Sequence, residues 1–231
     1  LDAARHNVAR GMPDLGLFES GTVYRAADEL AHEHHALAAL CTGRRTEAGF
    51  FQIKGILEAA LTALRVEWSV EADQWPFLHP GRSAAVLVAG ERVGFVGEVH
   101  PLVARSWEID QPVSAFAVDL GKLAAGAPEV TAYRDLTSFP SLRQDLAVVV
   151  GSGVRAADVL AAVREAGGEL LAGVEVFDVY TGEQVGEGRV SLALHLEYRA
   201  PDRTLSDEDV APVHERIVAA LREDLGGELR G

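Results

Sequence analysis

The feature that most constrains the fold of this chain is a short connection between two predicted strands near its C-terminal end. Residues 174–180 (VEVFDVY) and 189–198 (RVSLALHLEY) have strand composition, and leucines alternate along the second at 192, 194 and 196. The glycine-rich segment between them, 181–188, is only eight residues long. Neighbouring parallel strands need a crossover of a dozen or more residues, so we predict an antiparallel hairpin.

The segments on either side of this hairpin complete an order of six elements. Residues 145–150 predict a strand and residues 155–166 a helix. Ser206 and Asp209 form a capping-box pattern before a second helix, in which Pro212 predicts a late start or a kink. Residues 228–230 predict a short last strand. The order β-α-β-β-α-β is the split β-α-β, or ferredoxin-like, arrangement.

A dinucleotide-binding oxidoreductase is the alternative suggested by two glycines in this region. Gly151, Gly153 and Ala156 fit the pattern G-x-G-x-x-A between a strand and a helix, and Glu175 follows where a ribose-binding acid would lie. That fold needs a second helical crossover, which the eight-residue connection is too short to supply. We therefore expect the glycines to serve a strand-to-helix turn and not a cofactor.

The N-terminal part also mixes helices and strands. Residues 50–65 have apolar residues at helical spacing, residues 83–99 read as two strands joined at Gly90-Glu91, and residues 115–120 read as another strand. The stretch 121–128 (GKLAAGAP) reads as a linker. We predict an α+β chain with a mixed α/β core domain at 1–127 and a ferredoxin-like domain at 137–231.

Composition limits the function classes that are open to the chain. No run of about 18 apolar residues predicts a membrane span. The first thirty residues carry five acidic residues and no apolar block, so we expect no signal peptide, and because the chain begins with Leu1 we expect a fragment of a longer protein. The single cysteine, Cys41, is typical of a reducing, cytoplasmic compartment. The net charge of −14 excludes RNA binding over the whole surface, so any such role needs a local patch.

A candidate patch lies on the predicted four-stranded sheet. With both helices on one side, the other face is open, and the leucines of 189–198 must face the helices. Ser191, Ala193, His195, Glu197 and Arg199 then point to the open face, Arg143 precedes the strand at 145–150, and Arg203 follows the strand at 189–198. Such a face can hold single-stranded RNA by stacking and arginine contacts. An ordinary solvated sheet face is the alternative.

Several separated motifs, in order, resemble one family. In the C-terminal part they are FPSLRQDLAVVV (139–150), FDVYTG (177–182), SLAL (191–194), RTLSDE (203–208) and LR (229–230). In the N-terminal part they are LFESG (17–21), FFQIKG (50–55), HPG (79–81) and GFVGEVHP (94–101). Together they resemble the synthetase-like core domain and the anticodon-binding domain of the bacterial phenylalanyl-tRNA synthetase β subunit.

This resemblance implies the C-terminal part of a longer, N-terminally truncated β chain with a class II synthetase-like, non-catalytic core. It implies two partners, a phenylalanine-specific tRNA and a catalytic α subunit in an α2β2 assembly, and no membrane. It implies that ATP and Mg²⁺ are used by the whole enzyme and that this chain binds no cofactor. The residues expected to contact tRNA are Arg143, Tyr180, His195, Arg199 and Arg203. The family motif often has a second arginine at position 144, where this chain has Gln144, so we do not expect a two-arginine phosphate contact.

A histidine cluster, His32-Glu33-His34-His35, is the strongest local metal-site candidate. It does not fit H-E-x-x-H, because position 36 is alanine. On a helix His32 and His35 would be neighbours, but without a third ligand we expect no metal site and no catalytic residue. A purely structural assembly module without RNA contact remains the alternative function.

Overall fold

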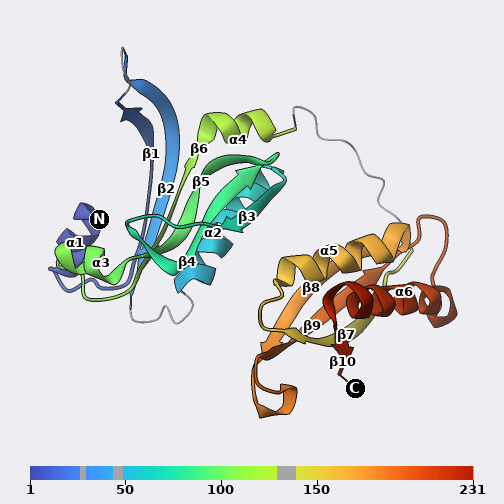
Figure 1. Cartoon of the computed structure of the whole chain (residues 1–231). Coiled ribbons are helices and arrows are strands. Elements are labelled where there is room, and N and C mark those ends of the chain that lie inside the picture. The colour runs from blue at the N-terminus through green and yellow to red at the C-terminus, as the bar shows by residue number, and fades with distance from the viewer. Residues whose placement is uncertain (27–29, 44–48, 129–138, 231) are drawn as a thin grey trace. The chain divides into compact units, whose positions relative to one another are not determined.

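The computed structural model describes residues 1–26, 30–43, 49–128 and 139–230, and they form two compact units, Leu1–Ala132 and Tyr133–Gly231 (Figure 1). Each unit is an antiparallel sheet with helices, so the chain is α+β. The start of the second domain, predicted at residue 137, lies outside the described residues.

The first unit is built on a six-stranded sheet in the order β1-β2-β6-β5-β4-β3, with every neighbouring pair antiparallel. Its strands are β1 (Leu15–Arg25), β2 (His32–Thr42), β3 (Trp68–Ala72), β4 (Leu78–Val88), β5 (Glu91–Val99) and β6 (Val113–Asp119). The two strands predicted within 83–99 and the strand predicted at 115–120 are therefore present as β4, β5 and β6.

Strands β1 and β2 form a long hairpin arm that extends past the other strands (Figure 1). All eleven residues of β2 pair with β1, but only Ala36–Thr42 also pair with β6. The histidine cluster lies on this arm and not on a helix. Successive side chains of a strand point to opposite faces, so His32 and His35 are not neighbours; His32 and His34 share a face, with ring centroids 6.0 Å apart.

Helices α2 (Gly49–Ala63) and α4 (Leu120–Gly126) pack on one face of this sheet. Helix α2 confirms the helix predicted at 50–65, and its stripe Ile53, Leu57 and Leu61 is buried against Val86, Val96 and Phe116. Helices α1 (Asp2–Val8) and α3 (Pro101–Ser106) lie at one end, where Ala4 and Ala104 join a smaller apolar cluster.

The linker predicted at 121–128 is wrong, because most of this stretch belongs to helix α4. The Asp119 carboxylate accepts hydrogen bonds from the backbone N–H groups of Gly121 and Lys122 at 2.9 and 3.1 Å, which caps the helix. Leu123 is buried in the main core of the unit. The glycines and alanines of this stretch therefore belong to a capped helix that packs on the sheet.

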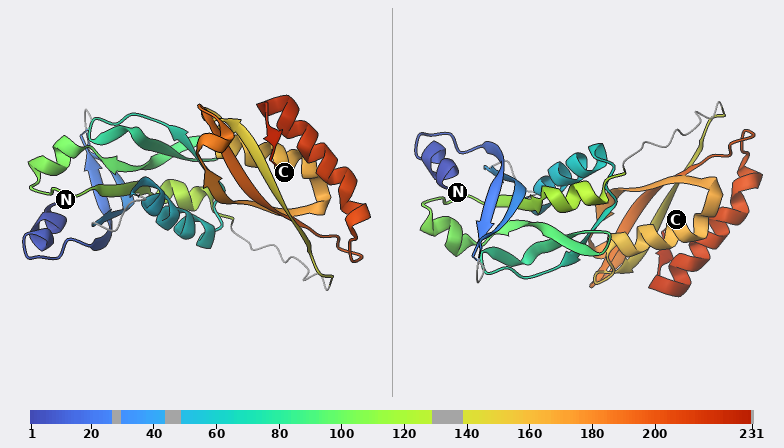
Figure 2. Two further views of the ribbon diagram at one scale, coloured as in Figure 1. Left: turned by 90° about the horizontal axis from the view of Figure 1, so that it is seen from below. Right: turned by 90° about the horizontal axis from the view of Figure 1, so that it is seen from above.

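The second unit has the predicted β-α-β-β-α-β order. Its elements are β7 (Leu142–Gly151), α5 (Ala156–Gly167), β8 (Leu171–Tyr180), β9 (Arg189–Tyr198), α6 (Asp207–Leu225) and β10 (Glu228–Leu229), with short 3₁₀ turns η1 (Gly168–Leu170) and η2 (Glu183–Val185). The sheet order is β10-β7-β9-β8, all antiparallel, which confirms the hairpin between β8 and β9 and contradicts the parallel sheet of a dinucleotide-binding fold. Both helices cover one face of this sheet (Figure 2).

The core of this unit follows directly from the alternation along β9. Leu192, Leu194 and Leu196 are buried against α5 and α6. Helix α6 begins at Asp207, directly after Ser206, with both capping-box hydrogen bonds formed, so the late start predicted from Pro212 is wrong. Gly226 ends the helix at φ 62°, a left-handed conformation that favours glycine.

Candidate nucleic-acid interface

The face of the four-stranded sheet opposite the helices carries most of the predicted site residues. Strand register places Arg143, Asp145, Ala147 and Val149 of β7 opposite Glu197, His195, Ala193 and Ser191 of β9. The next strand, β8, adds Glu175, Asp178 and Tyr180. The face is open to solvent at many of these positions, as the alternation of leucines predicts.

One end of this face is polar. His195 Nδ1 lies 2.5 Å from Asp145 Oδ1, directly across the strand pair. The carboxylate accepts a hydrogen bond from the Nδ1–H group, which orients the ring. Arg143 lies opposite Glu197, and Arg143, Asp145, His195 and Glu197 line a shallow depression of about 480 Å³. Arg143 makes no ion pair with the residues that the structure describes, so its guanidinium is available to a ligand.

A stacked pair of rings continues this end of the face. The ring of Phe177 lies parallel to the ring of His195, with centroids 3.8 Å apart and planes 10° apart. A β-bulge between Val176 and Asp178 turns Phe177 outward, and 48% of the residue stays exposed. Sequence reasoning missed this aromatic residue, because a bulge leaves no signal in the alternation of strand residues.

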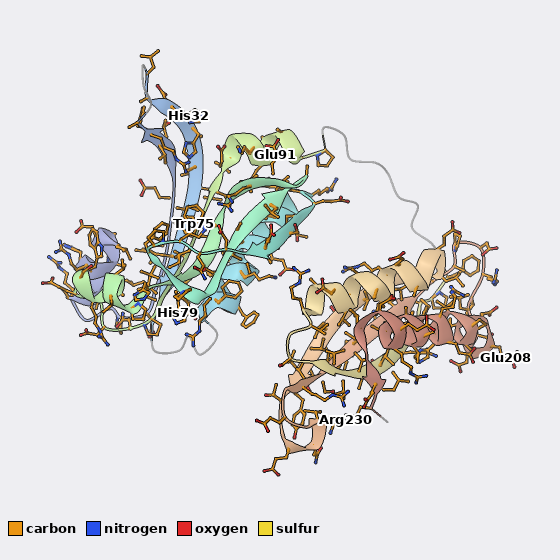
Figure 3. All side chains as sticks on the ribbon, in the orientation of Figure 1. His32, Trp75, His79, Glu91, Glu208 and Arg230 are labelled. Carbon is orange, nitrogen blue, oxygen red and sulfur yellow. The ribbon has the colours of Figure 1, made fainter. Side chains whose placement is uncertain are left out.

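Tyr180 lies at the other end of the same face. The guanidinium of Arg230 lies over its ring, with Cζ 5.1 Å from the ring centroid. Figure 3 labels Arg230 in the second unit. Tyr180 pairs with Ser191 of β9, and Arg143 pairs with Glu197 of β9. These two β9 residues are six positions apart. At about 3.4 Å per residue, the two ends are about 20 Å apart.

The structure does not bring all five predicted residues together. Arg143 and His195 share the polar end, and Arg199 lies beside them, where its Nη2 is 3.0 Å from the carboxylate of Glu197. Arg203 lies in the loop before α6, where its guanidinium is 3.6 Å from the carboxylate of Asp209. Arg203 thus pairs with a residue in the first turn of α6, and it lies outside the strands that form the open face.

The charge of the open face favours contacts with bases over contacts with phosphates. Four carboxylates lie on it, those of Asp145, Glu175, Asp178 and Glu197, alongside Arg143 and Arg199. Carboxylates repel phosphate but accept hydrogen bonds from the amino groups of bases. With two exposed rings beside them, the arrangement suits unstacked bases of a single strand.

Comparison with known proteins finds a matching family model for each of the two units. Residues 1–120 match the family described as "Phenylalanyl tRNA synthetase beta chain CLM domain", and residues 137–230 match the "Ferredoxin-fold anticodon binding domain". The chain belongs to the phenylalanyl-tRNA synthetase beta-chain family. This confirms the resemblance that the motifs indicate.

Curated relatives of this synthetase family match over the whole chain. It is 41% identical to the phenylalanine–tRNA ligase beta subunit of Symbiobacterium thermophilum, over 100% of this chain and 27% of the relative. The corresponding identities are 41% for Moorella thermoacetica and 34% for Bacillus subtilis, each over 100% of this chain and 30% of the relative. The chain thus spans less than a third of the length of these relatives.

Two further observations concern other kinds of site. Within the described part of the chain, no three His, Cys, Asp or Glu side chains are grouped so that they could hold a metal ion. No described helix is long and apolar enough to cross a membrane.

Proposed function

We propose that this chain is a non-catalytic part of the β subunit of a phenylalanine–tRNA ligase. The second unit binds the anticodon region of a phenylalanine-specific tRNA, and the first unit binds the catalytic α subunit in an α2β2 assembly in the cytoplasm. ATP and Mg²⁺ serve the α subunit and are not bound here. The contribution of this chain is positional, because it holds one end of the tRNA while chemistry proceeds at the other.

The observation that carries the RNA part is the pair of exposed aromatic positions on one open sheet face. Each of the two rings lies near carboxylates that can accept hydrogen bonds. Asp178 is near Tyr180. Asp145 and Glu175 are near Phe177. Single-stranded RNA is recognised by stacking on aromatic side chains and by hydrogen bonds to base edges. An anticodon offers such unstacked bases.

The α-subunit part is supported by exposed apolar side chains on the first unit. Phe18 on the hairpin arm is 81% exposed, Leu30 between its two strands is 84% exposed, and Phe51 on α2 is 74% exposed. Phe18 pairs with Ala39, which packs against the α2 core, so Phe18 and α2 lie on the same side of the sheet. Large exposed apolar side chains on one side of a sheet support a protein-binding surface there. The six-stranded antiparallel sheet is consistent with a class II synthetase-like core.

A tRNA titration tests the RNA part. Fluorescent phenylalanine-specific tRNA and a non-cognate tRNA are titrated with the chain at two salt concentrations. Tighter, salt-dependent binding of the cognate tRNA is expected. If neither tRNA binds, even when the α subunit is added, the alternative of a structural module without RNA contact is correct.

A pull-down with the α subunit tests the second part. Phe51→Asp is expected to weaken capture of the α subunit, because it places a charge in an apolar contact. Glu223→Gln on α6 of the second unit is the matched control and should leave capture unchanged. Equal capture by parent and Phe51→Asp would remove α2 from the interface.

A further inference from the structure

The first unit contains an apolar pocket on the sheet face opposite α2. It has a volume of about 450 Å³, within the range of small-molecule sites. Its lining comes from β1, β2, β4, β5, β6 and the N-terminal segment, and includes Leu17, Ala38, Leu40, Phe77, Phe95 and Ala117. All of these residues belong to the first unit, and ligand binding in the pocket does not require RNA binding by the second unit.

Strand register explains why a hollow forms at this place. Glu19 pairs with Ala38, Ala38 with Ala117, and Ala117 with Phe95, so these four residues form one row across β1, β2, β6 and β5. Neighbouring strands lie about 4.8 Å apart, so Glu19 and Phe95 are about 14 Å apart at the backbone. The two alanines between them are too short to fill that space.

One wall of the pocket is aromatic. The rings of Phe77 and Phe95 meet edge to face, with centroids 5.2 Å apart and planes 72° apart. Trp75, which is labelled in Figure 3, packs against Phe95 with ring centroids 5.2 Å apart. This wall offers a further ring the offset or edge contacts that aromatic pairs favour.

On the β1 side the pocket is lined by Leu17, Phe18 and one carboxylate, that of Glu19. Glu19 is exposed and lines the pocket, and it makes no ion pair or hydrogen bond with any residue in the described ranges. An unpaired carboxylate at the mouth of an apolar hollow complements a cation. The ligand that fits both walls has an aromatic ring and a positively charged amine.

We propose that this pocket binds small aromatic amines. The ring lies over Ala38 and Ala117 against Phe95, and the ammonium group contacts Glu19. Three probes with the same phenyl ring distinguish charge from apolar fit: phenethylamine is cationic, 2-phenylethanol is neutral and 3-phenylpropionate is anionic.

The test is an NMR titration of the whole chain with labelled alanine methyl groups. Phenethylamine should shift the Ala38 and Ala117 signals saturably, with a Kd on the order of 1 mM, as expected for so small a ligand. It should bind about two- to fivefold more tightly than 2-phenylethanol, because an exposed ion pair contributes modestly, and 3-phenylpropionate should bind most weakly.

Variants make the outcome decisive. Glu19→Gln should lower the affinity for the amine to that for the alcohol and leave the alcohol unchanged. Glu33→Gln, on β2 with its side chain on the other face, is the matched control and should change neither. Ala117→Leu should abolish binding by filling the hollow, and Ala38→Leu serves if that variant does not fold. Absence of saturable shifts with all three probes, or equal affinity of parent and Glu19→Gln for the amine, overturns the proposal.

Discussion

Tyr180 and Arg230 meet on the open face of the second unit, with the guanidinium Cζ 5.1 Å from the ring centroid. Arg230 is held in place from two sides. Its Nη2 donates to Gln184 Oε1 at 2.7 Å, and its backbone N–H donates to the carbonyl oxygen of Ala147 at 2.9 Å. Arg230, after β10, and Gln184, in the loop after β8, are therefore joined beside the ring of Tyr180.

Replacement of Tyr180 by leucine should weaken binding of phenylalanine-specific tRNA. Loss of a stacked base costs about 1–3 kcal/mol, which is roughly a 5- to 150-fold weaker Kd. Tyr180→Phe keeps the ring and should retain most of the affinity. Fluorescence titration of the two variants at one salt concentration measures the difference. Equal losses in both variants would mean that the hydroxyl matters and that stacking does not.

Arg143→Ala should reduce both the affinity for tRNA and its dependence on salt. One lost phosphate contact lowers the slope of log Kd against log salt concentration by about 0.7 to 1. Arg164→Ala, on the exposed surface of α5 across the unit, is the control with the same loss of charge. Titrations at several salt concentrations give both slopes. If the two variants have the same slope, the effect of Arg143 is one of net charge and not of contact.

The open face could be predicted from sequence because one strand is strictly alternating. Leu192, Leu194 and Leu196 identify the buried side of β9, and His195 and Glu197 follow onto the other side. The position of Phe177 could not be predicted, since it depends on a bulge in the pairing of β8 with β9. The separation of Tyr180 from Arg143 likewise depends on register, which sequence alone does not determine.

The first unit was predicted less completely. The hairpin arm of β1 and β2 extends beyond the core, so its outer residues show no buried stripe from which a strand could be inferred. Helix α4 was hidden by its glycines, although Asp119 is a good capping residue and Leu123 is an apolar anchor. For α4 these local signals were present, whereas for the outer arm only the pairing of β1 with β2 establishes the strands.

Gly94 in β5 should not tolerate alanine. A Cβ at this position would overlap the carbonyl oxygen of Ala117 and lie 2.8 Å from the Cα of Val118, both on the paired strand β6. Backbone atoms cannot move aside cheaply, so Gly94→Ala should destabilise the first unit by about 1–3 kcal/mol.

Gly21→Ala is the control for this change, because a Cβ there has nothing within 4 Å. All three tryptophans of the chain, Trp68, Trp75 and Trp107, lie in the first unit, so tryptophan fluorescence during urea unfolding reports this unit. A midpoint for Gly94→Ala equal to that of Gly21→Ala would show that β5 and β6 can separate to accept the methyl group.

Tyr198 should limit the stability of the second unit at high pH. Its side chain is fully buried at the end of β9, and its hydroxyl has no hydrogen-bond partner among the described residues. Burial raises the pKa of Tyr198 from 10.0 to about 12. The folded state thus keeps the hydroxyl protonated at a pH where the unfolded chain ionises it. Stability linked to this group is fully present below pH 10 and is lost as the pH rises to about 12.

Tyr198→Phe removes both the unpaired hydroxyl and this titration. At pH 8 the variant should be as stable as the parent or more stable by up to about 1 kcal/mol, because no hydrogen bond is lost. At pH 11 the stability of the variant relative to the parent should increase, since only in the parent does ionisation of residue 198 favour the unfolded state. Urea unfolding followed by circular dichroism measures both values, with Tyr24→Phe, at an exposed ring, as the control. A loss of more than about 1 kcal/mol at pH 8 would mean that the hydroxyl contributes a stabilising interaction to the core.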